Sequence, residues 1–194
     1  CYAPTGYDSY FLMPANWTTA TKNQVKADLD IMSSLGAEVI RINIGSSNGW
    51  YMEAGGGPGG SLFTSDYTGS LTNWVEFLGF VNARGLKIIP VLTNYNQAYG
   101  HWKAFYGDTD AGFTNFLTDV QYYYDGWIDA VNNNYPSIMP YVDLVGEYDR
   151  NNPRVDWYVR FVYDWLTVPD GKKGCSVLTI PNDSDDLYTE LGVD

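Results

Sequence analysis

Helical and strand-like segments alternate along almost the whole chain, and this alternation limits the fold more than any other feature of the sequence. Apolar residues recur at helical spacing over residues 21–35, 71–81, 113–131 and 155–166, and one more short helix is expected over residues 183–191. Apolar, β-branched runs predict strands over residues 38–44, 86–92, 141–147 and 176–180, after an irregular first strand within residues 7–13. Strands that alternate with helices form a parallel sheet covered by helices, so the sequence predicts an α/β fold.

Charge and hydropathy restrict the partners of this chain. Its 194 residues include 23 acidic and 11 basic ones, which gives a formal net charge of -12. This charge repels phosphate backbones and anionic membrane surfaces, so we expect no nucleic-acid partner. No run approaches the roughly 18 consecutive apolar residues that cross a bilayer, so no membrane span is expected. Aromatic residues make up 16% of the chain, which favours a surface that stacks on a ligand.

The two cysteines, Cys1 and Cys175, lie near opposite ends of the chain and leave three interpretations open. An exported protein whose signal peptide is cut before Cys1 would join the two in a disulfide. A bacterial lipoprotein would instead be acylated on Cys1, and the third interpretation is two unrelated thiols. Asn16 and Asn182 begin glycosylation sequons. Together with the low content of charged residues, these features predict a secreted, extracellular glycoprotein, with a lipid anchor on Cys1 as the alternative.

Several kinds of chemistry lack their motifs in this sequence. It has no nucleophile elbow, no Rossmann glycine fingerprint and no phosphate-binding loop, although residues 55–60 are rich in glycine. His101 is the only histidine, and one histidine cannot form a multi-histidine metal site. Asp183, Asp185 and Asp186 lack the spacing of a calcium-binding loop and fit a helix start better. We therefore expect neither a metal nor a cofactor.

Three segments resemble a known enzyme family. Residues 28–42 read Asp-Leu-Asp-Ile-Met-Ser-Ser-Leu-Gly-Ala-Glu-Val-Ile-Arg-Ile. Residues 85–92 read Gly-Leu-Lys-Ile-Ile-Pro-Val-Leu, and residues 142–149 read Val-Asp-Leu-Val-Gly-Glu-Tyr-Asp. In this order and spacing they are similar to the second, third and fourth strand regions of the (β/α)8 glycoside hydrolases related to family 5 cellulases and mannanases. Residues 176–180 and 187–194 resemble the fifth strand of that family and the helix after it.

The resemblance implies a (β/α)8 barrel of the TIM type that is incomplete as given. It covers about the first five-eighths of the family barrel, so residues 1–194 would form one domain of about five βα units, truncated before the sixth strand. A complete barrel has eight strands and typically about 250 residues. The open edges of a partial barrel would need either a missing C-terminal half or self-assembly with other copies.

The resemblance also implies hydrolysis of a β-linked polysaccharide such as cellulose or mannan. Retaining hydrolysis needs one protonated and one ionised carboxyl group. Glu147 matches the general acid/base of the family, and Arg41 matches a strand arginine that approaches the nucleophile. Gly146 and Tyr148 stand where the family has Asn and Pro. The nucleophile of the family lies on a seventh strand, which has no counterpart in these residues.

Arg41 and Asn43 also stand out from the residues alone. Arg41 lies within an apolar strand, so it needs a carboxylate, and a structural pair with Glu147 or Asp143 is the alternative to a role in the pocket. Asn43 shares its strand face by alternation and could bind a sugar hydroxyl. The loops after the second and third strands would bring further stacking and polar side chains to the same rim. These candidates for carbohydrate binding are Trp50, Tyr51, Asn94, Tyr95, Tyr99, His101 and Trp102.

A second interpretation belongs to a different class of protein. A non-catalytic structural or carbohydrate-binding protein could keep the partial barrel and assemble through its open sheet edges. The preferred interpretation is a glycoside hydrolase with Glu147 as the general acid/base. In both interpretations the partner is an oligosaccharide or a polysaccharide.

Overall fold

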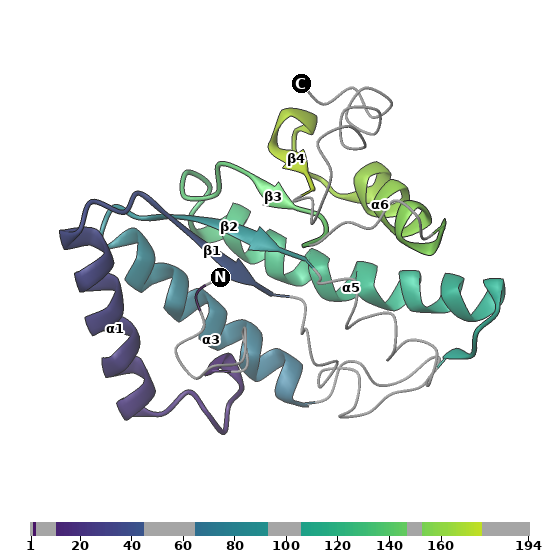
Figure 1. Cartoon of the computed structure of the whole chain (residues 1–194). Coiled ribbons are helices and arrows are strands. Elements are labelled where there is room, and N and C mark those ends of the chain that lie inside the picture. The colour runs from purple at the N-terminus through teal and green to yellow at the C-terminus, as the bar shows by residue number, and fades with distance from the viewer. Residues whose placement is uncertain (1, 3–10, 45–64, 93–105, 147–152, 176–194) are drawn as a thin grey trace.

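A computed structural model describes residues 2, 11–44, 65–92, 106–146 and 153–175 of the chain (Figure 1). The α-helices in these residues are α1 (Thr19–Ser34), α3 (Ser65–Asn82), α5 (Asp110–Asn134) and α6 (Pro153–Trp165). The strands are β1 (Val39–Asn43), β2 (Lys87–Val91), β3 (Val142–Asp143) and β4 (Lys173–Gly174), and a 3-10 helix, η2 (Asp170–Lys172), directly precedes β4. No helix in these ranges is long and apolar enough to cross a membrane.

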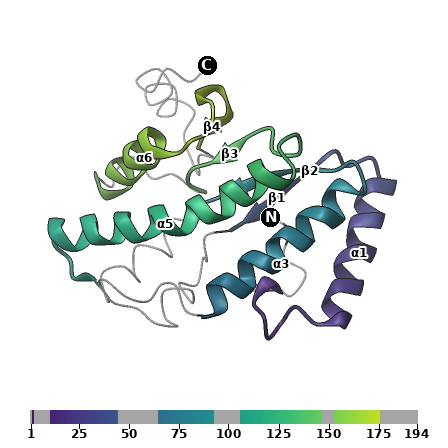
Figure 2. The same cartoon turned by 180° about the vertical axis from the view of Figure 1, so that it is seen from behind.

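The four strands form one parallel sheet in the order β1-β2-β3-β4. Each strand therefore pairs with the next strand in the sequence, and a helix lies in every connection between them. Helices α3 and α5 lie behind the strands in Figure 1 and in front of them in Figure 2, so they cover the same face of the sheet. This arrangement confirms the predicted α/β fold.

Helix α1 begins at a threonine cap and ends at a glycine. The Thr18 side chain accepts a hydrogen bond from the Thr21 backbone amide at 3.2 Å, which satisfies one of the unpaired donors of the first turn. The helix thus starts two residues before the expected position, and Thr18 rather than Thr21 is its capping residue. Gly36 follows the helix with φ of 83°, a conformation that costs a residue with a side chain about 1 kcal/mol more than glycine.

Pro90 lies inside β2 without disrupting the sheet. Successive residues of a parallel strand donate alternately to the two neighbouring strands. Ile88 donates to Ile138 and Leu92 donates to Asp143, so the missing donor of Pro90 would also point toward the β3 side. Strand β3 begins only at Val142 and pairs with β2 through Val91 and Asp143. The proline therefore lies at the start of the β2–β3 contact, where the pair given by the register is Val91 with Asp143.

The core between the sheet and the helices is rich in aromatic rings. The indole of Trp74 on α3 packs against that of Trp127 on α5 with 5.0 Å between ring centroids. Its Nε1 donates a hydrogen bond of 3.1 Å to the Trp127 carbonyl oxygen, so the ring is both packed and satisfied. Both side chains are fully buried, and Ile40 and Ile42 of β1 belong to the same core. These contacts join α3, α5 and the sheet into one packed unit.

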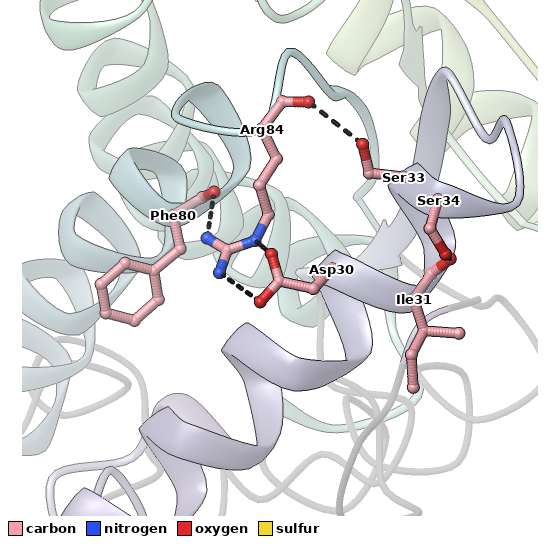
Figure 3. Close-up of polar contacts among 6 residues, drawn as sticks. All are labelled: Asp30, Ile31, Ser33, Ser34, Phe80 and Arg84. Carbon is pink, nitrogen blue, oxygen red and sulfur yellow. Dashed lines mark hydrogen bonds and ion pairs between the residues drawn. The ribbon is translucent and has the colours of Figure 1, made fainter.

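An arginine clamp joins the C-terminal ends of α1 and α3 (Figure 3). The Arg84 guanidinium donates to both carboxylate oxygens of Asp30, at 2.7 and 3.1 Å, and to the Phe80 carbonyl oxygen at 3.0 Å. The Ser33 hydroxyl approaches the Arg84 carbonyl oxygen from α1. The Asp30 carboxylate is largely exposed, so water and salt screen the pair and its main effect is to orient the two helix ends.

Two expected elements differ from the structure, and a third lies outside the described residues. Phe11 and Leu12 form a short 3-10 turn rather than part of a first strand, and the backbone amide of Tyr2 donates to Arg41 on β1 instead. Strand β3 is shorter than the expected strand over residues 141–147, although Gly146 forms an isolated bridge. Strand β4 begins at Lys173, whereas the strand predicted over residues 176–180 lies outside the described residues.

Candidate functional site

One face of the sheet carries the polar side chains that the helices do not cover. The last residues of the four strands lie in register, in the order Asn43, Val91, Asp143 and Gly174. Since side chains alternate along a strand, Arg41 projects from the same face as Asn43, opposite to the core residues of β1. Arg41, Asn43 and Asp143 together are called the polar row below.

The Arg41 side chain crosses β2 and binds Asp143 on β3. Its Nη2 and Nε lie 2.6 and 3.2 Å from the same carboxylate oxygen of Asp143. The Asp143 side chain is only 3% exposed, whereas that of Arg41 is 38% exposed. A carboxylate so deeply buried needs a cation close by, so Arg41 is the partner that makes this burial tolerable. Of the two structural partners considered for Arg41, the structure shows the contact with Asp143, whereas Glu147 lies outside the described residues.

Asn43 is the second buried polar residue of the row. It is 5% exposed, and its Oδ1 has no hydrogen-bond partner in the part of the chain that the structure describes. Leaving a buried carbonyl oxygen unsatisfied costs about 1 to 3 kcal/mol. An apolar side chain would suit this position better, because Val91, which lies beside Asn43 in β2, is apolar and buried.

A second group of polar side chains lies where β3 and β4 meet α5 and α6. Cys175 follows β4 and is a buried thiol that forms no disulfide in the structure. Burial raises the pKa of this thiol, and the nearby negative charge of Asp143 raises it further. Burial also raises the pKa of the Tyr158 hydroxyl, with a smaller contribution from Tyr124. The Cys175 thiol and the Tyr158 hydroxyl therefore stay protonated and neutral at neutral pH. They pack in the core and do not act as acids or bases at that pH.

Many of the predicted site residues fall in parts of the chain that the structure does not describe. Glu147 directly follows the bridge residue Gly146 but lies outside the described residues. Cys1 and Asn182 lie outside them as well, and Asn16 lies half-buried in the turn before α1. The same holds for every loop candidate for carbohydrate binding, namely Trp50, Tyr51, Asn94, Tyr95, Tyr99, His101 and Trp102. The structure therefore unites Arg41 with Asp143, in the same row as Asn43, and leaves the other predictions untested.

Asp143 is the site residue whose importance the sequence analysis underestimates. The sequence indicates it only as an alternative partner of Arg41, whereas in the structure it ends β3 and is the one carboxylate of the polar row, only 3% exposed. A signal was present, since Asp143 interrupts the apolar run Val142-Asp143-Leu144-Val145 as Arg41 interrupts that of β1. Two opposite charges in two buried strands are expected to meet.

Comparisons with known proteins leave the family of this chain open. No family model matches the sequence, and no curated protein matches it either. Within the described ranges, no group of three or more histidine, cysteine, aspartate or glutamate side chains could hold a metal ion. The polar row is thus the feature from which a function can be argued.

Proposed function

We propose that this protein is a glycoside hydrolase of the (β/α)8 type that acts on a β-linked polysaccharide such as cellulose or mannan. The observation that carries the proposal is the position of the polar row, with Asn43 and Asp143 each ending a parallel strand. In (β/α)8 enzymes the catalytic side chains come from the carboxyl ends of the strands. Glu147, four residues after Asp143, is the proposed general acid/base.

The strand order supports the barrel part of the proposal. In doubly wound sheets the order of the strands reverses at a switch point, so the first strand in the sequence lies in the middle of the sheet. Here the four strands follow one another in sequence order, as the strands of a (β/α)8 barrel do. The face that carries the polar row would then be the interior of the barrel, and α3 and α5 would belong to its outer ring.

The Arg41–Asp143 pair supports a positioning role for Asp143. Retaining hydrolysis uses two carboxyl groups about 5 to 5.5 Å apart, one as acid/base and one as nucleophile. Asp143 is bound to a guanidinium and is almost fully buried, so it is a poor nucleophile. It instead fixes Arg41, whose partly exposed guanidinium would face the reacting sugar. In a complete barrel of this family the nucleophile would come from the seventh strand, which has no counterpart in residues 1–194.

Release of reducing sugar tests this function directly. Wild type and Glu147→Gln are incubated with a panel of β-glucans and mannans, and the intact mass of the purified protein is measured in parallel. Glu38→Gln is the matched control, because Glu38 is exposed and precedes β1 at the opposite end of that strand. We expect release by wild type and by the control and little by Glu147→Gln. Equal release by Glu147→Gln would refute the role of Glu147, and no release by wild type would refute the hydrolase.

An exposed apolar surface on α1 supports the second candidate, a non-catalytic protein that assembles. Ile31 lies in the last turn of α1 and Leu35 directly follows the helix, and they are 58% and 81% exposed. They lie on the flank away from α3, because Lys22, Lys26 and Asp30 make the contacts toward α3. A second helix packed there would bury them, from another copy or from a further part of the same protein. An extracellular location and glycans on Asn16 and Asn182 belong to either proposal.

A further inference from the structure

We infer that Asn43 is a specificity-determining residue whose Oδ1 accepts a hydrogen bond from a hydroxyl group of the bound sugar. This inference rests on the proposed function, because it assigns a ligand to the same polar row. Its starting observation is the buried Oδ1 atom, which has no hydrogen-bond partner among the described residues. Buried polar atoms in folded proteins nearly always have a partner, so an exception calls for an explanation.

The position of Asn43 argues against a purely structural role. Asn43 itself is 5% exposed, and the residue beside it in β2, Val91, is apolar and buried. A β-branched apolar residue would suit such a strand interior, both in propensity and in desolvation. A polar residue that destabilises the fold at the end of a strand is typical of a functional site, where a residue is kept for its function although it lowers stability.

The charges of the polar row indicate which chemical group of a ligand could bind to Asn43. Asp143 lies in the same register row and is neutralised by Arg41, so this surface offers no unpaired cation for an anionic ligand among the polar-row side chains. A phosphate or carboxylate beside the buried Asp143 would meet a like charge in a region of low dielectric constant. The amide oxygen of Asn43 is a neutral acceptor, and the matching ligand group is a neutral donor. Sugar hydroxyl groups are donors of this kind.

Two substitutions separate a ligand contact from a structural one. Asn43→Leu nearly preserves the shape of the side chain, and Asn43→Val gives the residue that best suits a strand, while both remove the acceptor. The matched control is Ser70→Ala on α3. Ser70 is fully buried and its Oγ also has no partner within the described residues, but it belongs to a helix that covers the other face of the sheet.

The experiment measures thermal midpoints and the binding of two probes, cellohexaose and mannohexaose, by calorimetry. We expect both Asn43 variants and Ser70→Ala to melt about 2 to 4 °C or more above wild type, since each removes a buried unsatisfied oxygen. Only the Asn43 variants should bind the better probe more weakly, with a Kd raised about tenfold or more. Ser70→Ala should bind it as wild type does.

Each other outcome has a definite meaning. Unchanged Kd values in both Asn43 variants would overturn the inference, since a resident water would then be the partner of Oδ1. A lower thermal midpoint in both variants would overturn it as well, because Asn43 would then stabilise the fold. If wild type binds neither probe, both the inference and the polysaccharide ligand are wrong. If the variants weaken binding but wild type releases no sugar, the inference stands and the hydrolase proposal fails.

Discussion

Arg41 on β1 and Asp143 on β3 are 102 residues apart in the sequence, yet their side chains meet across β2 with 2.6 Å between Nη2 and Oδ2. The carboxylate is buried and the guanidinium is partly open to solvent. This pair is the strongest electrostatic feature of the polar row, and its energetics can be tested without knowledge of the ligand.

Breaking the pair from one side should destabilise the fold. In Arg41→Leu the Asp143 carboxylate stays buried without this cation, so we expect a loss of about 3 kcal/mol in the free energy of unfolding. We choose the low end of the usual range because the Arg41 side chain is 38% exposed. Urea unfolding at pH 7 measures the effect. The double variant with Asp143→Leu should recover most of the loss, and a double variant as unstable as the single one would contradict the pairing argument.

The thiol of Cys175 should be unreactive until the protein unfolds. Burial raises its pKa, so the native protein should react slowly with a thiol reagent at pH 8. In denaturant without reductant, the reaction should reach two thiols per chain if Cys1 and Cys175 are unpaired. No thiol signal in denaturant would instead support the disulfide between them. The Cys175→Ala variant identifies which signal belongs to which residue.

Alkaline pH should destabilise the fold through the same thiol. The folded state holds the Cys175 proton more tightly than the unfolded chain does, since its folded pKa is raised above the ordinary value of 9.0. Stability is therefore kept below pH 9 and is lost as the pH rises above it. Between pH 9 and 10 the thiol alone should remove about 1 kcal/mol from the free energy of unfolding. Cys175→Ala should show a correspondingly shallower decline, and an identical decline would contradict this assignment.

The exposed surface of α1 should control any self-association. Ile31→Lys combined with Leu35→Lys should leave the thermal midpoint nearly unchanged, because both side chains are exposed in the structure. If copies assemble through this surface, the double variant should be monomeric where wild type forms larger species. Light scattering after size-exclusion chromatography measures this. Thr68→Lys with Asn82→Lys on exposed positions of α3 is the control for added charge. A monomeric wild type would contradict the assembly proposal.

The Trp74–Trp127 contact should be the most sensitive part of the core. Trp74→Ala removes a fully buried indole and should cost about 3 to 5 kcal/mol, whereas Trp74→Phe keeps much of the ring and loses the bond to the Trp127 carbonyl oxygen. We expect Trp74→Phe to lose about 1 to 3 kcal/mol. Denaturant unfolding followed by circular dichroism compares the two. Equal losses would mean that the hydrogen bond, not the packing, dominates this contact.

The helices and the two longer strands could be predicted because their signals are local. The periodicity that places Val25 and Leu29 inward is a property of one helix, and Gly36 ends that helix through its own backbone conformation. Leu35 followed the same periodicity but is exposed, because the helix ends one residue earlier and no described element covers that flank. The short strands β3 and β4 were harder to place, since two residues carry almost no periodic signal.

The sequence by itself determined the α/β class, the alternation of helices with strands and the need of Arg41 for a carboxylate, because hydrophobic periodicity and the cost of burying a charge act within single segments. Only the tertiary structure decided that Asp143 meets Arg41, that Asn43 shares the register row of Asp143 and that Oδ1 of Asn43 is buried without a described partner. These relationships depend on the order and register of strands far apart in the chain. No local pattern encodes that register, since it results from the packing of all the helices and strands together.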